Sequence, residues 1–553
     1  MNSEPRSSTR FESRDWTALA LLLAGWFALP LLLGTGAPIP LNDDWAYAQT
    51  VRTLLETGEF RRPSWTWVPA ITHTAWGALF TQVFGFTFQA LRWSSLVAGA
   101  FGLAGAFTLA RRTGVATAGA ALLAATFAFN PVHVHLAFTF MTDVPFIALC
   151  LWSLVFLGDH LRSGSWIALI AGTALAIAAT LSRQTALVLP AAFAVAAVLA
   201  RPLAWRAWLA AALCVGAVGF VYLRAEEWLF ATGGRWSRLY SVRDASKFIA
   251  AAQPAIPFHL LKHGVATLVA LGWFLLPLTL RAAAPLRLRL AASALGIALA
   301  TFLMLRLDLA LPPTYNIVRD LGLGPLTIGG HEHLPHAPRW LWWALTALGA
   351  AAGAQAIAFF LARTLPRLRE TLRRADLLLL LAFSAGFLLP HLARPPFFDR
   401  YVFTLVAPLG VALLAAASKR EPDAPRWRRV ASLAALALFV LFSFVGTRDY
   451  LVRSEAKWAL LQELRAQGYG ERVVVGGIEY NGWFDDFDPY ERAPKDDFVW
   501  DDEFVASYAP SQPGYAQHAQ QAYMRWLPFG EERVYVLRRI ERQSQPAEQA
   551  LPR

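Results

Sequence analysis

The sequence is poor in charge and in cysteine. Asp, Glu, Lys and Arg make up 16% of its 553 residues, whereas 56% are hydrophobic. A soluble domain carries about 25% charged residues, and a core of this size could not bury such an excess of apolar side chains. Only two cysteines are present, Cys150 and Cys214, and both fall in apolar stretches, so we predict no disulfide framework and two small buried side chains. The composition indicates a polytopic membrane protein.

Long apolar windows are the main positive feature of the chain. A helix needs roughly 20 apolar residues to cross a bilayer, and the backbone can be satisfied there only in helices or closed barrels. We therefore predict a mainly α fold with about 13 transmembrane helices. The windows are 16–34, 92–110, 115–131, 144–161, 166–182, 185–200, 207–223, 263–281, 288–306, 340–362, 375–393, 401–417 and 429–446.

The arginines predict how these helices are oriented. Cytoplasmic connections retain Lys and Arg. With the N-terminus inside, the arginine-bearing turns all fall on the cytoplasmic side, and an odd number of spans puts the C-terminus outside, as in a bacterial inner-membrane protein. The net charge of +12 is then an orientation signal, and nucleic acid is not an expected partner. The arginine-bearing segments are 6–14, 111–112, 162, 201–206, 281–289, 363–374 and 419–429.

The first apolar window lacks a small-residue cleavage pattern, so we expect it to be retained as a helix. We divide the chain into a transmembrane domain, 1–446, and a small extracytoplasmic α/β domain, 447–553. The outer loop 35–91 contains two amphipathic stretches, 44–58 and 75–93, which predict interfacial helices.

The C-terminal domain is predicted from a change in pattern. An amphipathic helix over 450–467 precedes a short strand at 472–476, and a second strand is expected at 532–538. An acidic, aromatic run over 485–504 lies between the strands and is interpreted as a surface segment. A sheet with only these strands would not be stable alone. We therefore expect this domain to pack on the outer loops.

Three carboxylates on the predicted outer side are the leading candidates for chemistry. Asp43 and Asp44 follow the first apolar window, and Asp143 stands between the third and fourth windows. Ionisable groups at a membrane boundary are more often functional than packing residues. A carboxylate could take a proton from a hydroxyl while outer arginines hold a phosphate, which is the chemistry of a sugar carried on a lipid phosphate.

Several segments occur in an order that resembles a known superfamily. They are Asp43 with Asp44, the amphipathic helix after Tyr47, Thr142-Asp143-Val144-Pro145, 181–185, 316–325, 399–401 and 477–483. In this order, and on one side of the membrane, they resemble segments of the GT-C superfamily of polyprenyl-phosphate-dependent glycosyltransferases. The resemblance is to the branch that contains the protein O-mannosyltransferases and the lipid A aminoarabinose transferase. The resemblance implies a GT-C type transmembrane fold and a polyprenyl-phosphate sugar donor.

The resemblance also implies roles for individual residues. By position, Asp43 matches the carboxylate proposed as catalytic base, Asp44 its acidic neighbour and Asp143 the second loop carboxylate. The aminoarabinose transferases carry Glu-Lys-Pro-Pro where this chain has 69–73, so the lysine that contacts phosphate is missing. No cofactor is implied, and nothing in the sequence supports a divalent metal. The candidates for the phosphate contact are Arg183, Arg400, Arg319 and His73. Arg183 ranks first among them.

Each acidic candidate has a simpler structural interpretation. Asp43 and Asp44 could cap the helix that follows them, because Asp favours helix N-termini. Asp143 could likewise cap the fourth span, with Pro145 in its first turn.

The basic candidates and the histidines also have structural interpretations. Arg183 could extend to the membrane boundary without binding anything. Arg400 could form a local ion pair with Asp399. The cluster of His331, His333 and His336 does not have the spacing of a specific zinc site, so we interpret it as a solvated loop.

These observations favour an inverting glycosyltransferase, hexosyl or pentosyl, that moves a sugar from a polyprenyl-phosphate donor to a hydroxyl of a lipid, glycan or protein acceptor outside the cytoplasm. The main alternative is a transporter or flippase of a lipid-linked sugar. That would require ionisable residues at mid-membrane depth or broken helices in related halves, and neither is evident in the sequence. A structural envelope protein would leave the outer carboxylates unexplained.

Overall fold

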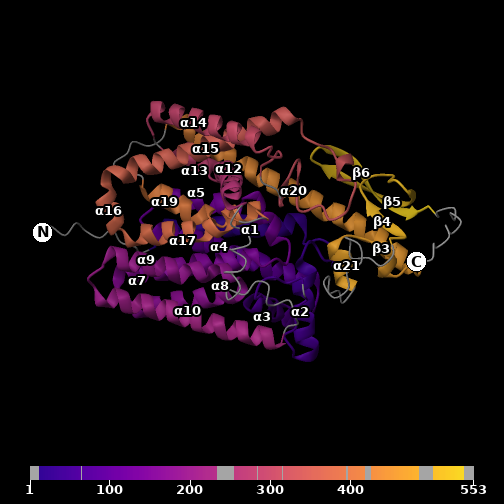
Figure 1. Cartoon of the computed structure of the whole chain (residues 1–553), viewed down its shortest axis with the longest axis horizontal. Helices are drawn as coiled ribbons and strands as arrows, with labels where there is room; N and C mark the ends of the chain where they lie inside the picture. Colours follow the sequence, from indigo (N-terminus) through magenta and orange to yellow (C-terminus); the bar gives the residue numbers. More distant parts are fainter. Residues whose placement is uncertain are drawn as a thin grey trace, which may run out of the picture.

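The computed structural model describes residues 11–63, 65–232, 255–282, 284–313, 316–393, 396–416, 425–484 and 502–540. Long helices lie side by side along its longest axis, and a small sheet caps one end (Figure 1). We call this end the sheet end. Residues 485–501 of the predicted acidic run lie outside the described residues, as do residues 1–10 and 233–254.

Each predicted apolar window falls on a helix, so the mainly α fold is confirmed. By length and composition, nine helices in the described part of the chain could cross a membrane, or ten if one bent pair is a single span. The helices on which the predicted windows fall, not all of which are among those nine, are α1 (Ser13–Leu33), α4 (Phe88–Arg112), α5 (Thr117–Ala128), α7 (Asp143–Ser163), α8 (Trp166–Ser182), α9 (Val188–Ala200), α10 (Trp205–Thr232), α12 (Ile256–Phe274), α14 (Leu286–Arg306), α15 (Arg339–Thr364), α17 (Ala375–Leu392), α19 (Val406–Ala416) and α20 (Arg426–Ala466).

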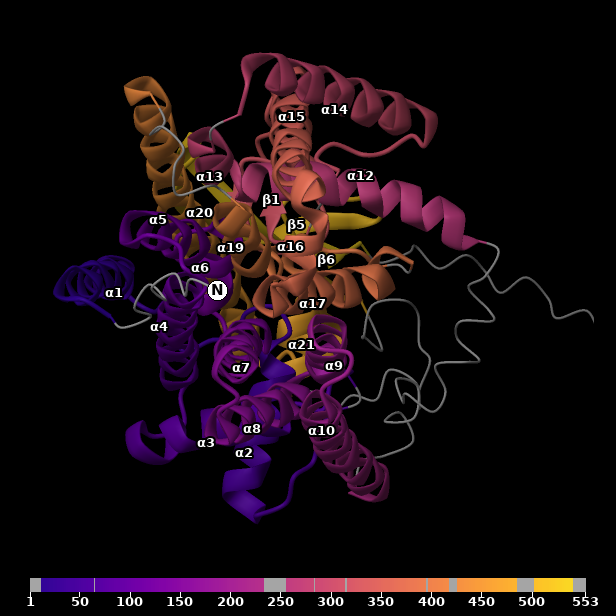
Figure 2. The same cartoon turned by 90° about the vertical axis from the view of Figure 1, so that its left-hand side faces the viewer.

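The arginine-bearing turns meet at the end opposite the sheet, which we call the arginine end. Arg111 donates to the carboxylate of Asp15 over 2.9 Å, which joins α4 to α1. Arg374 donates to the carbonyls of Ala415 and Thr113, which joins the start of α17 to two further turns. Seen from this end in Figure 2, α14 and α10 lie at opposite edges of the bundle, and the short helices α13 (Leu276–Arg281) and α16 (Leu368–Arg373) fill the connections.

One span is broken, which the sequence analysis did not foresee. After α5 the chain bends by 59° into α6 (Pro131–Ala137). The Asn130 side chain accepts from the backbone N–H of Val132 over 3.0 Å, and Pro131 occupies the first turn, so a helix start is encoded here. All residues of α6 are buried. The sequence analysis, which saw no broken helices in related halves, did not predict this bend.

The outer loop has one helix as predicted and one that was misplaced. Helix α2 (Asp44–Thr57) ends at Gly58, whose φ is +75°. The predicted helix 75–93 is wrong, because α3 (Ile71–Phe84) ends at Gly85 and α4 begins afterwards at Phe88. The hydroxyl of Thr87 accepts from Ala90 N over 3.1 Å and caps α4.

The predicted final span and the amphipathic helix after it form one uninterrupted 41-residue helix, α20. Beyond it lie η7 (Glu471–Val473), β3 (Val474–Val475), α21 (Ile478–Phe484), β4 (Phe504–Ser507), β5 (Tyr515–Trp526) and β6 (Phe529–Arg539). The sheet has the order β3-β4-β6-β5, with β3 parallel to β4 and the other pairs antiparallel. The two predicted strands are present as β3 and β6, whereas β4 and β5 were missed.

The sheet packs on α20, whereas the sequence analysis expected it to pack on the outer loops. The carboxylate of Asp449 on α20 accepts from the backbone N–H groups of Trp526 and Leu527, each over 3.0 Å. A segment between α14 and α15 also reaches the sheet end. It contains β1 (Val318–Arg319), β2 (Gly322–Leu323) and the short helix η5 (His331–His333).

Candidate functional site

Asp143 lies between two guanidinium groups from distant parts of the chain. It is the first residue of α7, where an apolar run begins after Thr142. Arg183 follows α8, directly before the short helix η1 (Gln184–Leu187), and its Nη1 lies 2.5 Å from Asp143 Oδ1. Arg400, on α18 (Asp399–Phe403), lies 3.7 Å from Oδ2. The side chains of these three residues are all largely buried. We call the two arginines and the carboxylate the charged centre of the site.

Asp43 lies beside this charged centre at the start of α2. It is half-buried, and its Oδ1 accepts from Trp65 Nε1 over 2.9 Å. Burial raises the pKa of the Asp43 carboxyl, while Arg400 and the Trp65 hydrogen bond oppose the rise and Glu479 and Asp143 add to it. Asp43 stands at the cap position of α2 but makes no capping hydrogen bond there. Helix capping is therefore not what its carboxylate does in this structure.

Tyr47 and His73 line the same region as neutral groups. Burial raises the pKa of Tyr47 to about 12, so its hydroxyl keeps its proton at neutral pH. His73 is fully buried on α3, stacked on Phe140 with ring centroids 4.1 Å apart, and burial lowers its pKa to about 4. The imidazole is uncharged at neutral pH. It could donate a hydrogen bond to a phosphate but could not supply a positive charge.

Asp44 has different partners from Asp43 and is bound to the backbone. Its Oδ1 accepts from Leu41 N over 2.6 Å and its Oδ2 from Phe140 N over 3.4 Å. Burial raises its pKa to about 7, against the opposing charge of Arg92. Asp44 thus ties the turn before α2 to the segment before α7. This arrangement sets the position of Asp43 relative to Asp143.

Arg92 is a residue that sequence reasoning missed. It is fully buried at the start of α4 and donates to the carbonyls of Thr35 and Ala37 over 2.5 and 2.8 Å, and to that of Ile39. These contacts fix the loop that leads to Asp43. A charged residue at the edge of an apolar window was the only signal for it in the sequence.

Arg319 and Asp399 occupy the wall next to Arg400. The Asp399 carboxylate accepts from Ile317 N over 3.1 Å and Val318 N over 2.7 Å, and so anchors β1, which carries Arg319. The ion pairs of Asp143 are with Arg183 and Arg400, not with Arg319. The suggested local ion pair between Asp399 and Arg400 is wrong, because Asp399 binds backbone N–H groups and Arg400 pairs with Asp143.

A second buried ionic group reaches the site from the C-terminal region. Lys457 of α20 pairs with Glu479 of α21, and Thr327 Oγ1 donates to Glu479 Oε1 over 2.8 Å. Glu479 raises the pKa of both Asp43 and Asp44. Sequence reasoning missed this group because its members are 22 and 130 residues apart. A single lysine on the buried face of α20 was the available signal.

The side chains of the histidine cluster do not point to a common centre. His336 Nδ1 lies 2.6 Å from Asp320 Oδ2, whereas His333 is exposed beside Glu332. Within the part of the chain that the structure describes, no group of three or more His, Cys, Asp or Glu side chains could hold a metal ion.

Comparison with known proteins gives a family match over part of the chain. A family model described as dolichyl-phosphate-mannose-protein mannosyltransferase matches residues 70–225, which include His73, Asp143 and Arg183. This match lies in the same part of the chain as two of the segments on which the resemblance to GT-C glycosyltransferases was drawn from the sequence. A comparison with curated protein sequences gives no match.

Three solved structures are similar to the chain at 14% identity. The crystal structure of ArnT from Cupriavidus metallidurans bound to undecaprenyl phosphate has a TM-score of 0.46, with 97% of this chain and 100% of that chain covered. The Saccharomyces cerevisiae protein O-mannosyltransferase Pmt1–Pmt2 complex bound to the sugar donor gives 0.32, with 41% and 36% covered. The arabinosyltransferase EmbB from Mycobacterium smegmatis gives 0.35, with 81% and 42% covered.

Proposed function

We propose that this protein is a membrane glycosyltransferase that transfers a sugar from a polyprenyl-phosphate donor to an acceptor hydroxyl at the sheet end, with inversion at the anomeric carbon. The observation that carries the proposal is the convergence of Arg183 and Arg400 on Asp143, with the half-buried carboxylate of Asp43 beside them. We place the sheet end outside the cytoplasm, at a bacterial inner membrane, because the arginine-bearing turns gather at the other end.

Each group has a role in a single displacement. Arg183 and Arg400 can each offer two parallel N–H groups to the donor phosphate, and they stabilise the charge that develops as the bond from the anomeric carbon to the phosphate oxygen breaks. The acceptor oxygen forms the new bond on the opposite face of the sugar and gives its proton to Asp43. Asp143 holds the two guanidinium groups in place. The bond electrons leave with polyprenyl phosphate.

The raised pKa of Asp43 suits a general base. Burial makes the carboxylate a better proton acceptor than an exposed aspartate, while Arg400 keeps the ionised form accessible. Trp65 fixes its orientation through the 2.9 Å hydrogen bond. Whether the transferred sugar is a hexose or a pentose is not determined by these groups.

The first prediction tests the base. Asp43→Asn should lower turnover by roughly a hundredfold or more, because an amide cannot accept the acceptor proton. Sugar transfer from a polyprenyl-phosphate donor to acceptor lipids and glycans of the parent envelope is measured, with thermal stability as the check on folding. Asp44→Asn is the neighbouring control and should reduce turnover less. Full activity in Asp43→Asn would remove this assignment.

A transporter of lipid-linked sugars is the second candidate, favoured by the break between α5 and α6. The buried ring nitrogens of His135 on α6 have no hydrogen-bond partner among the described residues, and buried ionisable groups at broken helices are typical of transporters. Vesicles containing the purified protein and a fluorescent lipid-linked sugar distinguish the two. Movement of the lipid across the bilayer without any transfer product would favour transport.

A further inference from the structure

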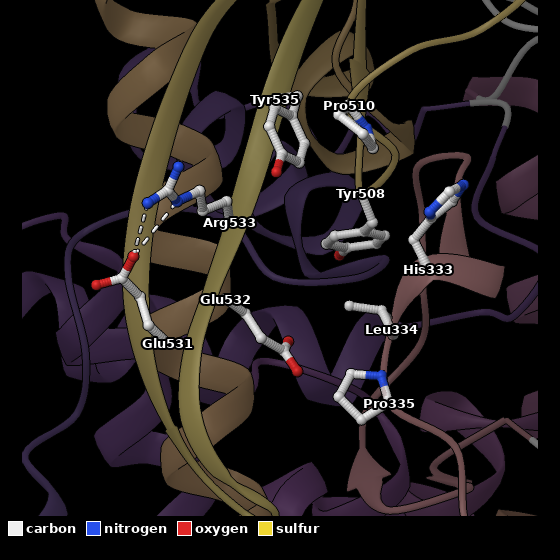
Figure 3. A pocket seen from close by; sticks show the side chains of 9 residues that line it. All are labelled: His333, Leu334, Pro335, Tyr508, Pro510, Glu531, Glu532, Arg533 and Tyr535. Atoms are coloured by element: carbon white, nitrogen blue, oxygen red, sulfur yellow. Dashed lines mark hydrogen bonds and ion pairs between the residues drawn. The ribbon is translucent and has the colours of Figure 1, made fainter.

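A cavity of about 570 Å³ lies at the sheet end, away from the charged centre. One wall is the segment 333–335, at the end of η5, and the other is formed by β6 and the turn after β4. Figure 3 shows Tyr508 between these walls, with His333 and Leu334 on one side and Tyr535, Glu532 and Arg533 on the other. Its volume is within the usual range for small-ligand sites, about 300–1,000 Å³.

The cavity is formed by a close backbone fit between distant segments. Tyr508 N donates to Gly329 O over 3.0 Å, so the segment before η5 extends the sheet at β4. Gly330 has a φ of +76°, and a Cβ at this position would lie 2.4 Å from Ala509 N. A side chain at residue 330 would push the wall away from β4. The cavity is therefore preformed, which lowers the entropic cost of binding a ligand.

The charges in the cavity are already paired. Arg533 Nη2 lies 3.0 Å from Glu531, and Glu532 accepts from Arg525 over 2.9 Å and from Tyr523 over 2.7 Å. No excess of positive charge is therefore offered to a phosphate. The carboxylates retain further lone pairs, which can accept from ligand hydroxyl groups.

Two tyrosine rings supply the remaining surface. Tyr508 and Tyr535 line the cavity and offer flat apolar faces together with hydroxyl groups. A sugar ring has the matching chemistry, since it carries hydroxyls around its edge and C–H groups on its faces. A hydrocarbon tail would cover the carboxylates of the wall without offering them hydrogen bonds, which is unfavourable.

Contacts between elements connect the cavity wall to the helix that follows Asp43. The guanidinium of Arg453 on α20 lies 5.8 Å from the ring centroid of Tyr508 and 5.5 Å from that of Tyr450. Thr327 Oγ1, on the segment that leads to the cavity wall, donates to Glu479 Oε1 of α21 over 2.8 Å. Gln49 of α2 donates to Gly482 O of α21 over 2.9 Å. The cavity wall is thus joined through α21 to α2, the helix that follows Asp43.

We propose that this cavity binds a neutral saccharide portion of the acceptor, which makes the acceptor a glycan or glycolipid. The acceptor role rests on the proposed transferase function. Saccharide binding itself needs neither donor nor turnover, so it can be measured separately.

The test uses the purified full chain in detergent and two neutral disaccharides, cellobiose and N,N′-diacetylchitobiose, with binding followed by saturation-transfer NMR. At least one should bind the parent. Leu334→Trp, which fills the cavity, should weaken that binding at least tenfold, and Pro510→Trp at the exposed rim gives a second blocking variant. Gln521→Ala, on the exposed part of β5 outside the cavity, is the matched control and should bind like the parent.

Three outcomes would overturn the proposal. The first is that neither disaccharide binds the parent. The second is that the blocking variants that keep the parent's thermal stability bind the sugar as the parent does. The third is that a peptide rich in Ser and Thr displaces the sugar. Arg183→Lys separates this proposal from the proposed function, because it should retain disaccharide binding. Saccharide binding without any transfer activity would leave the cavity assignment standing and contradict the transferase.

Discussion

At the scale of single residues, the charged centre has two cations facing one carboxylate. Asp143 balances only one of the two guanidinium charges, and Asp43 lies next to Arg400. When Asp43 takes up a proton, the local charge becomes more positive. The site therefore holds the leaving phosphate more strongly at the moment when the acceptor has lost its proton.

The second prediction concerns the donor phosphate. Arg183→Lys and Arg400→Lys should each weaken binding of a polyprenyl-phosphate sugar at least tenfold, because an ammonium cannot reproduce two parallel hydrogen bonds. Binding is measured in detergent, and Arg319→Lys is the comparison, for which a smaller loss is expected. If all three variants bind like the parent, the phosphate site lies elsewhere and His73 becomes the candidate.

The third prediction concerns the pH dependence of stability at Asp44. The unfolded chain releases this proton near its ordinary pKa of 3.8, and the folded chain near 7. Between these values the folded state binds more protons, so stability falls as pH rises from 4 to 7 and is level above 7.

The variant Asp44→Asn removes this titration, so its thermal midpoint should fall less between pH 4 and pH 7 than that of the parent. Glu56→Gln, at the exposed end of the same helix, is the control and should follow the parent curve. Identical slopes for the parent and Asp44→Asn would show that Asp44 does not titrate in this range.

The candidate site was only partly predictable at this scale. Asp143 and Arg183 stand at the ends of apolar windows, where a charge is costly unless it is paired, so the sequence marks them. Their pairing with Arg400 was not visible, because it depends on how α7, α8 and α18 meet. For the pair of Lys457 and Glu479, the single lysine of α20 was the one local signal, and each residue resembles an ordinary surface residue of an amphipathic segment.

At the scale of elements, the length of the apolar windows predicted the helices well. Residues that start a helix, such as Asn and Pro, were given too little weight within those windows. The break between α5 and α6 follows from Asn130 and Pro131, which start a helix inside an apolar window. Strand β5 was missed because most of its side chains are exposed and it is rich in Gln and Ala. It is defined by pairing with β6 and not by alternating apolar residues.

The fourth prediction concerns the contact between α20 and α21. Lys457→Met leaves Glu479 buried without its cation and should destabilise the protein by about 3–5 kcal/mol. The double variant Lys457→Met/Glu479→Gln should regain most of this loss, because no buried charge is left unpaired. Thermal midpoints in detergent compare the parent, the single variant and the double variant. A single variant as stable as the parent would mean that the pair contributes no stability.

At the scale of the whole molecule, the two ends of the bundle differ in charge and in structure. The turns joined by Arg111 and Arg374 lie at one end, and the sheet with the charged centre lies at the other. A membrane that sorts its loops by positive charge should therefore place the two ends in different compartments.

The fifth prediction is the topology. Reporter fusions after Arg112, Arg206 and Arg374 should report the cytoplasm, and a fusion after Gly468, beyond the end of α20, should report the outside. The fusion point follows Gly468 because Tyr450 lies within the continuous helix. A cytoplasmic signal after Gly468 would contradict both the orientation and the outward placement of the site.

The uninterrupted α20 has a geometric consequence for the whole protein. A helix of 41 residues is about 60 Å long, roughly twice the thickness of a bilayer core, so a single rod carries both the last span and the sheet. Each residue turns such a rod by about 100°. The direction in which the sheet and its cavity face is thus set by the number of residues between the bundle and Asp449, so insertions there should be tolerated only near whole helical turns.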